Sequence, residues 1–138
     1  MILNNPQNPT GGFSDKNKID QLAYGLKKFP HVAILSDDIY SRQVFDGKSM
    51  PTFLNYPHLY DRLIVLDGWS KTYSMTGWRL GWGVWPEQLV EYIFKFCVNN
   101  HSCVNAAVQF GGIAALEGSD DFIKFMMEKF SKRRKLLF

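Results

Sequence analysis

Hydrophobic and polar positions alternate along the chain in a way that predicts strands connected by helices. Residues 32–35 and 63–66 are short apolar runs rich in β-branched side chains, typical of strands buried on both faces. Before the first run, Ile19, Leu22, Ala23 and Leu26 follow the i, i+3, i+4, i+7 spacing of an amphipathic helix. Ser14 or Asp15 supplies its N-cap, and Pro30 ends the segment.

The remaining apolar segments extend this pattern. Residues 1–4 read as the end of a strand, and residues 80–85 as a further strand. Pro86 suits the first position of a helix that carries Leu89, Val90, Ile93 and Cys97 inward. Residues 104–116 and 122–138 read as two more helices, separated at Gly118. This order predicts an α/β fold class with a mainly parallel sheet.

Composition places the chain among ordinary globular proteins. Its 138 residues suit one domain, and 46% hydrophobic with 21% charged residues is close to average usage. The net charge of +3 is mild and predicts no nucleic-acid partner. The basic run at residues 132–135 is interpreted as the solvated face of a terminal helix.

The two cysteines, Cys97 and Cys103, are predicted to be buried free thiols in a reducing compartment. His101 stands alone near them, so no metal site is predicted. No segment reaches the ~18 uncharged apolar residues of a membrane span. The first residues also lack the pattern of a secretory signal, so we expect a cytoplasmic protein without a membrane partner.

Three polar clusters follow the predicted strands. They comprise residues 8–12, 37–40 and 68–79. In parallel sheets, functional residues gather beyond the carboxyl ends of the strands. The sequence therefore predicts one site built from these three clusters.

Single residues of these clusters have both chemical and ordinary roles. Lys71 alone reads as a surface charge, but its place among small hydroxyl residues just past a buried strand would suit an imine-forming amine. Arg79 offers a bidentate fork for a phosphate, or a salt-bridged side chain between two tryptophans. Asp37 could hold a buried cation. For Asp38 we expect only a turn cap, and alone Tyr40 and Asn8 read as a core aromatic and a turn residue.

Together the clusters resemble the class I/II (fold type I) pyridoxal-phosphate (PLP)-dependent aminotransferases. The matching segments are Asn8-Pro9-Thr10-Gly11, Ser36-Asp37-Asp38-Ile39-Tyr40 and Ser70-Lys71-Thr72-Tyr73-Ser74-Met75-Thr76-Gly77-Trp78-Arg79-Leu80-Gly81. They occur in the family's order, and residues 130–134 resemble the helix that leads to that family's C-terminal domain. The resemblance implies a three-layer fold with helices on both faces of the sheet.

The resemblance also implies a role for each motif residue. Lys71 would form the internal aldimine with PLP and later move the proton between Cα and C4′. Asp37 would pair with the pyridinium nitrogen, and Asn8 and Tyr40 would hydrogen-bond O3′. Arg79 and Ser70 would bind the phosphate. Some relatives carry a second phosphate-binding serine where this chain has Gly68.

By the same resemblance, residues 1–138 form only the central part of a large PLP-binding domain. The N-terminal part of that domain and the C-terminal small domain would be absent, so the isolated chain is expected to bind PLP poorly and to be inactive. The parent protein would be a homodimer that transfers an amino group between an L-amino acid and a 2-oxo acid.

Three alternatives remain at this point. A C–S lyase or another synthase reaction uses the same scaffold, but C–S lyases typically show His where this chain has Tyr40, and aminocyclopropane-carboxylate synthases differ in the lysine loop. A PLP-sensing regulator would carry a DNA-binding module, and no helix-turn-helix pattern is visible. A truncated, inactive gene product is the third.

Overall fold

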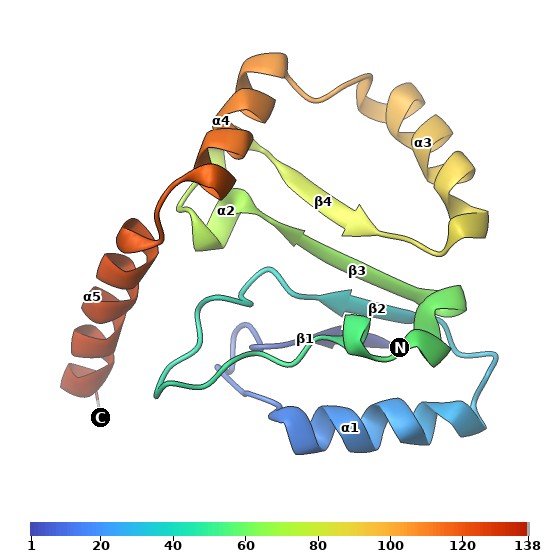
Figure 1. Ribbon diagram of the computed structural model, residues 1–138, viewed down its shortest axis with the longest axis horizontal. Helices are drawn as coiled ribbons and strands as arrows, with labels where there is room; N and C mark the ends of the chain where they lie inside the picture. The colour runs from blue at the N-terminus through green and yellow to red at the C-terminus, as the bar shows by residue number, and fades with distance from the viewer. Residues whose placement is uncertain (138) are drawn as a thin grey trace.

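The computed structural model describes residues 1–137 and contains one four-stranded sheet (Figure 1). The strands follow the order β1-β2-β3-β4 and comprise β1 Ile2–Asn4, β2 Ile34–Asp37, β3 Leu63–Gly68 and β4 Gly81–Val84. β1, β2 and β3 are parallel, whereas β4 runs antiparallel to β3. The mainly parallel sheet predicted from the sequence is therefore confirmed, with β2 beginning two residues later than its apolar run.

Within residues 1–137, five α-helices accompany the sheet. They are α1 Lys16–Gly25, α2 Trp69–Thr72, α3 Glu87–His101, α4 Ala106–Glu117 and α5 Asp121–Leu137. Short 3-10 turns occupy Leu26–Lys28, Phe53–Asn55, Pro57–Arg62 and Thr76–Trp78. Asp15 is the N-cap of α1, as predicted, since its carboxylate accepts from the Lys18 N–H; Pro86 is the N-cap of α3 instead of its first residue.

The core lies between α1 and the sheet. Ile19 and Ala23 of α1 pack with Ile34, Leu63 and Val65 of the two central strands, and all five are almost inaccessible to solvent. The apolar spacing of α1 gives that helix one hydrophobic face, which the sheet covers. Burying each large side chain of this set stabilises the fold by about 1.5–3 kcal/mol.

The expectation that α3 packs inward is wrong for the described part of the chain. No residue of α3 is buried, and Val90 and Phe94 are 52% and 68% exposed. Cys97 is only half-buried, and Cys103 lies exposed in the loop before α4, so neither is the buried thiol predicted. Periodicity identified the apolar side of the helix, but residues 1–137 cover it only in part: Ile93 and Cys97 are half-buried, whereas Leu89 and Val90 are exposed.

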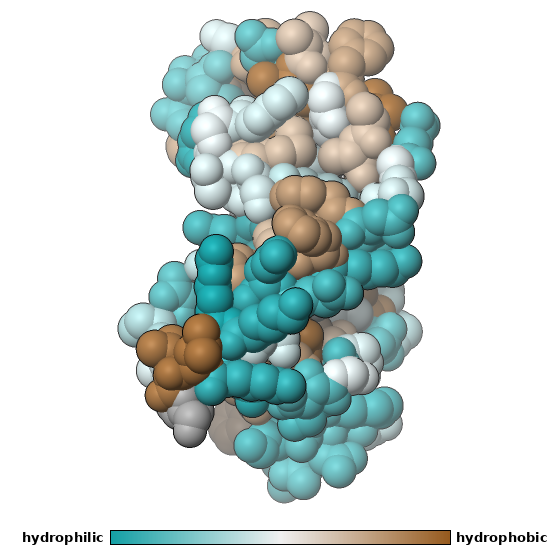
Figure 2. Space-filling view, turned by 90° about the vertical axis from the view of Figure 1, so that its left-hand side faces the viewer, coloured by the Kyte–Doolittle hydropathy of each residue, from teal (hydrophilic) through white to brown (hydrophobic). Residues whose placement is uncertain are grey.

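Figure 2 shows that the side of the molecule formed by α5 is mainly hydrophilic. The basic side chains at 132–135 are all exposed there, which confirms their interpretation as a solvated helix face. Between residues 1 and 137, no helix combines the length and hydropathy needed to cross a membrane.

Strand register aligns the carboxyl ends of the parallel strands. Asn4 of β1 is level with Asp37 of β2, and Asp37 is level with Leu66 of β3. α2 begins three residues beyond Leu66, at Trp69. The three polar clusters predicted from the sequence therefore start from one edge of the sheet.

Candidate active site

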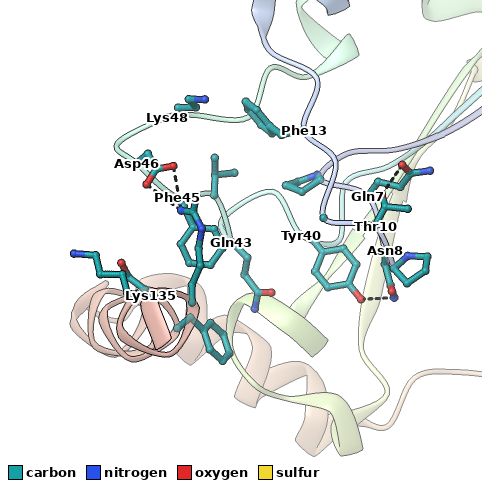
Figure 3. A pocket seen from close by; sticks show the side chains of 17 residues that line it. Gln7, Asn8, Thr10, Phe13, Tyr40, Gln43, Phe45, Asp46, Lys48 and Lys135 are labelled. Atoms are coloured by element: carbon teal, nitrogen blue, oxygen red, sulfur yellow. Dashed lines mark hydrogen bonds and ion pairs between the residues drawn. The ribbon is translucent and has the colours of Figure 1, made fainter. Parts of the chain in front are cut away.

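The turn after β1 meets the segment after β2 through two side chains. The Asn8 amide nitrogen donates to the Tyr40 hydroxyl oxygen at 3.0 Å (Figure 3). The backbone N–H of Asn8 donates in turn to Oδ1 of Asn4, at 2.7 Å. Asn4 of β1 therefore fixes the turn, and Asn8 of the turn fixes the position of the Tyr40 hydroxyl.

Lys71 lies beside the same tyrosine. Its Nζ is 5.8 Å from the centroid of the Tyr40 ring, and its side chain forms no hydrogen bond or ion pair with residues 1–137. The Gln43 amide donates to the backbone carbonyl oxygen of Lys71 at 2.9 Å. This contact was not predicted, because Gln43 lies 28 positions from Lys71 and belongs to no motif.

Asp37 is the last residue of β2 and is half-buried. One carboxylate oxygen, Oδ1, accepts from the Ile39 N–H at 3.3 Å, and the Asn4 amide donates to the Asp37 backbone oxygen at 3.1 Å. Within the described chain, Oδ2 accepts no hydrogen bond. Asp37 therefore keeps one oxygen free for a donor from a ligand.

Asp38 is not the side-chain turn cap predicted from the sequence. Its carboxylate is buried, accepting from the Ser36 hydroxyl at 2.6 Å and the Thr52 hydroxyl at 3.3 Å. Burial raises the pKa of Asp38 to about 6, because loss of water disfavours the ionised form. Strand alternation is the reason: Asp38 follows Ser36 on the covered face, and Asp37 points to the other.

Asp67 is an acid that the sequence analysis missed as a site residue. It lies in β3, half-buried, and accepts from the Gly68 N–H at 2.6 Å and the Ser41 hydroxyl at 3.1 Å. Burial raises the pKa of Asp67, and the negative charge of Asp37 raises it further. Its position at a strand end, like that of Asp37, was the signal that could have identified it.

Ser70 and Arg79 begin and end a closed segment. The Trp69 N–H donates to the Leu80 carbonyl at 3.3 Å, which joins the two ends of the segment. Arg79 adopts a left-handed backbone conformation with φ 52° and donates to the Thr76 carbonyl at 3.0 Å. Within residues 1–137, neither the Ser70 nor the Arg79 side chain forms a hydrogen bond with Asn8 or Tyr40.

The absence of a side chain at Gly68 has a steric cause. A Cβ atom there would lie 2.9 Å from both the Gly81 Cα and the Leu80 carbonyl oxygen. Both are backbone atoms, at the start of β4 and in the residue before it, and they cannot rotate away as a side chain could. A serine at this position would need β4 to move.

A cavity of about 980 Å³ lies beside Asn8 and Tyr40 (Figure 3). Of the six predicted site residues, only Asn8 and Tyr40 line it. Its far wall is α5, which is held by an ion pair of 2.9 Å between Arg134 and Asp46. Tyr40 thus lines the cavity, and its ring centroid also lies 5.8 Å from the Lys71 amine.

Comparison with known proteins identifies the family of this chain. The model of the family "Aminotransferase class I and II" matches residues 1–138, the whole chain. The chain belongs to this family. Aminotransferases of this family and fold are PLP-dependent.

Individual aminotransferases agree with the assignment. The chain is 38% identical over 138 residues to the aspartate aminotransferase of Sulfurisphaera tokodaii, matching 100% of this chain and 34% of that protein. The crystal structure of the Rhizobium meliloti aspartate aminotransferase superposes with a TM-score of 0.93 at 35% identity, over 98% of this chain and 34% of that one. The aromatic aminotransferase of Pyrococcus horikoshii superposes with a TM-score of 0.92 at 29% identity, over 99% of this chain and 36% of that one.

The aminotransferase chain spans about a third of the length of the curated relatives that it matches. The match includes every segment that carries the site, from the turn after β1 to the start of β4. The resemblance seen in the three motifs is therefore confirmed at the level of family and fold.

Proposed function

We propose that this chain is the central, lysine-bearing part of a PLP-dependent aminotransferase, which moves an amino group between an L-amino acid and a 2-oxo acid. The observation that carries the proposal is the free amine of Lys71, 5.8 Å from the ring of Tyr40. That tyrosine is itself fixed by Asn8. The family's dependence on PLP supports the cofactor.

The side chains at this edge fit the chemical groups of PLP. Three atoms have unused bonding capacity: Nζ of Lys71, Oδ2 of Asp37 and the Tyr40 hydroxyl hydrogen, since that oxygen already accepts from Asn8. An amine suits the aldehyde carbon, a carboxylate suits the ring nitrogen, and a hydroxyl suits the phenolic oxygen. Ser70 and Arg79 would bind the phosphate, which matches the hydroxyl and guanidinium donors they offer.

Each residue then has a defined task. PLP, when bound, supplies an electron sink for the electrons released at the substrate Cα. The Asp37 carboxylate holds a proton on the ring nitrogen, because a nearby negative charge favours the protonated ring. The Lys71 amine would hold the cofactor and, once released from it, would accept the proton from the substrate Cα. Tyr40 and Asn8 orient the phenolic oxygen.

The substrate is proposed by analogy with the relatives. Relatives at 36% to 38% identity are named aspartate aminotransferases, which makes aspartate the first amino donor to test. We further propose a cytoplasmic homodimer with no nucleic-acid or membrane partner. The central position of this chain in a longer large domain belongs to the same proposal.

Reductive trapping tests the lysine directly. The complete protein that contains this chain would be mixed with PLP, reduced with borohydride and digested, and its peptides analysed by mass spectrometry. We expect one pyridoxyl group on Lys71, no label in Lys71→Ala, and normal label in Lys95→Ala, a control on exposed α3. A label on another lysine, or none in the wild type, would overturn the proposal. Analysis of the products from aspartate and a 2-oxo acid then separates transamination from β-elimination.

A further inference from the structure

Trp69 closes residues 69–80, the lysine segment, and connects this segment to α4. Its backbone N–H donates to Leu80, and its carbonyl oxygen accepts from the N–H groups of Tyr73 and Met75 at 3.1 and 3.4 Å. The indole Nε1–H donates to the carbonyl oxygen of Gly112 in α4, at 3.0 Å and across 43 positions. Lys71 lies two residues after this connection.

Two glycines, Gly111 and Gly112, allow α4 to lie close to residues 69–80. A Cβ at Gly112 would lie 2.5 Å from Leu80 Cδ2 and 3.3 Å from the Trp69 indole. A Cβ at Gly111 would lie 2.3 Å from the ring of Trp78. α4 therefore contacts the residue before Ser70 and the residues on both sides of Arg79.

The lysine segment needs such an external anchor. α2 has only four residues, and a helix of that length is unstable without tertiary contacts. The Lys71 side chain has no hydrogen bond within the described residues that would fix it. Its position is thus determined by the backbone on which it is carried, and the Trp69–Gly112 contact holds that backbone from the helix side.

We propose that Trp69 is a positioning residue for the cofactor site, which acts by docking residues 69–80 onto α4. The docking fixes the distance between the Lys71 amine and the Arg79 guanidinium, the two ends of the site that would bind one cofactor. This inference rests on the proposed function, because it assumes that both residues bind PLP. The indole N–H is the decisive group, since it alone bonds Trp69 to α4.

The test compares Trp69→Phe, which keeps an aromatic ring but loses the N–H, with Trp82→Phe, which alters a partly exposed tryptophan of β4. The complete apo-protein of each variant would be titrated with PLP, and the rate of borohydride-fixed labelling at Lys71 would be measured. The melting temperature without PLP reports stability separately. We expect Trp69→Phe to raise the Kd for PLP by about fivefold and to slow labelling similarly, the effect of one lost hydrogen bond. Trp82→Phe should match the wild type.

A purely structural role predicts a different result. It would lower the melting temperature of the Trp69→Phe apo-protein while leaving the Kd and the labelling rate at lower temperature unchanged, and that result would overturn the positioning role. No labelling of Lys71 in the wild type would instead overturn the proposed function.

If Trp69→Phe does not fold, the helix side of the contact provides the second variant. Gly112→Ala, made together with Leu80→Val to give the new methyl group room, shifts the acceptor carbonyl and leaves Trp69 intact. The same rise in Kd is expected, and an unchanged Kd would contradict the inference.

Discussion

The amide of Asn8 and the hydroxyl of Tyr40 are 3.0 Å apart although 32 positions separate them in the sequence. The hydrogen bond joins the turn after β1 to the segment after β2. Because Asn8 is the donor, the hydroxyl hydrogen of Tyr40 remains available to a ligand.

The first prediction tests this pair by a double-mutant cycle. Tyr40→Phe removes the acceptor of Asn8 and the donor to the cofactor, so kcat/KM for transamination should fall about tenfold. Asn8→Ala should have a smaller effect, and the double variant should be less impaired than the sum of the two, with a coupling of about 1 kcal/mol. Strict additivity would contradict the interaction. Tyr60→Phe, which removes a hydroxyl that bonds the Leu54 carbonyl elsewhere, is the control.

A second prediction concerns Gln43, whose amide donates to the Lys71 carbonyl at 2.9 Å. Gln43→Leu keeps a side chain of similar size but removes the donor, so the affinity of the apo-protein for PLP should fall about threefold. Titration with PLP, followed by absorbance, measures the change. Gln88→Leu removes a comparable amide bond to the Asp61 carbonyl and should leave the affinity unchanged. Equal effects in both variants would show that the Gln43 contact is not specific to the site.

The third prediction concerns the glycine three residues before Lys71. Gly68→Ser places a Cβ 2.9 Å from backbone atoms of Gly81 and Leu80, so the free energy of unfolding should fall by about 1–3 kcal/mol. Chemical denaturation of the complete protein measures it. Gly25→Ala, at the end of α1 where an added Cβ would meet no atom of another part of the structure within 4 Å, should instead raise it by up to about 1 kcal/mol. A stable Gly68→Ser variant would show that β4 can shift.

The fourth prediction concerns the buried acid Asp38, whose pKa is raised to about 6 from an ordinary 3.8. The folded protein holds the proton more tightly than the unfolded chain, so this group favours folding below pH 4, and its contribution is lost as the pH rises through 6. The loss is on the order of 3 kcal/mol at most. Unfolding measured from pH 4 to pH 7 should therefore change less in Asp38→Asn than in the wild type. Asp61→Asn, at an exposed position, should retain the wild-type slope; a wild-type slope in Asp38→Asn would contradict the burial argument.

The fifth prediction concerns residues 1–138 as an isolated chain. Phe94 of α3 and Phe110 of α4 are 68% and 73% exposed, and exposed apolar surface of this kind promotes association. We expect the isolated chain to aggregate and to bind PLP far below one equivalent. Absorbance after mixing with PLP, together with light scattering, measures both. A monodisperse chain with a stoichiometric, borohydride-fixed adduct would contradict the prediction.

Local sequence patterns predicted the elements well where one physical factor dominated. The apolar spacing in α1 and the β-branched runs of β2 and β3 identified the core, because these segments are buried by each other. The same spacing in α3 gave a wrong prediction of burial, since periodicity identifies an apolar face but not its partner. Asp38 was misinterpreted for a related reason: its buried carboxylate accepts a hydrogen bond from Thr52, which lies 14 positions along the chain.

The sequence by itself determined the α/β class, the parallel strands and the gathering of three polar clusters at one sheet edge, because these follow from periodicity, turn residues and chain order. It also specified, through three motifs, the family to which the chain belongs. Only the tertiary structure decided which partners fix the site: Gln43 on the Lys71 carbonyl and Trp69 on Gly112, separated by 28 and 43 positions. Such contacts depend on how the helices, strands and loops pack together. A local sequence pattern cannot predict them, because the two partners lie in segments that are far apart in the sequence.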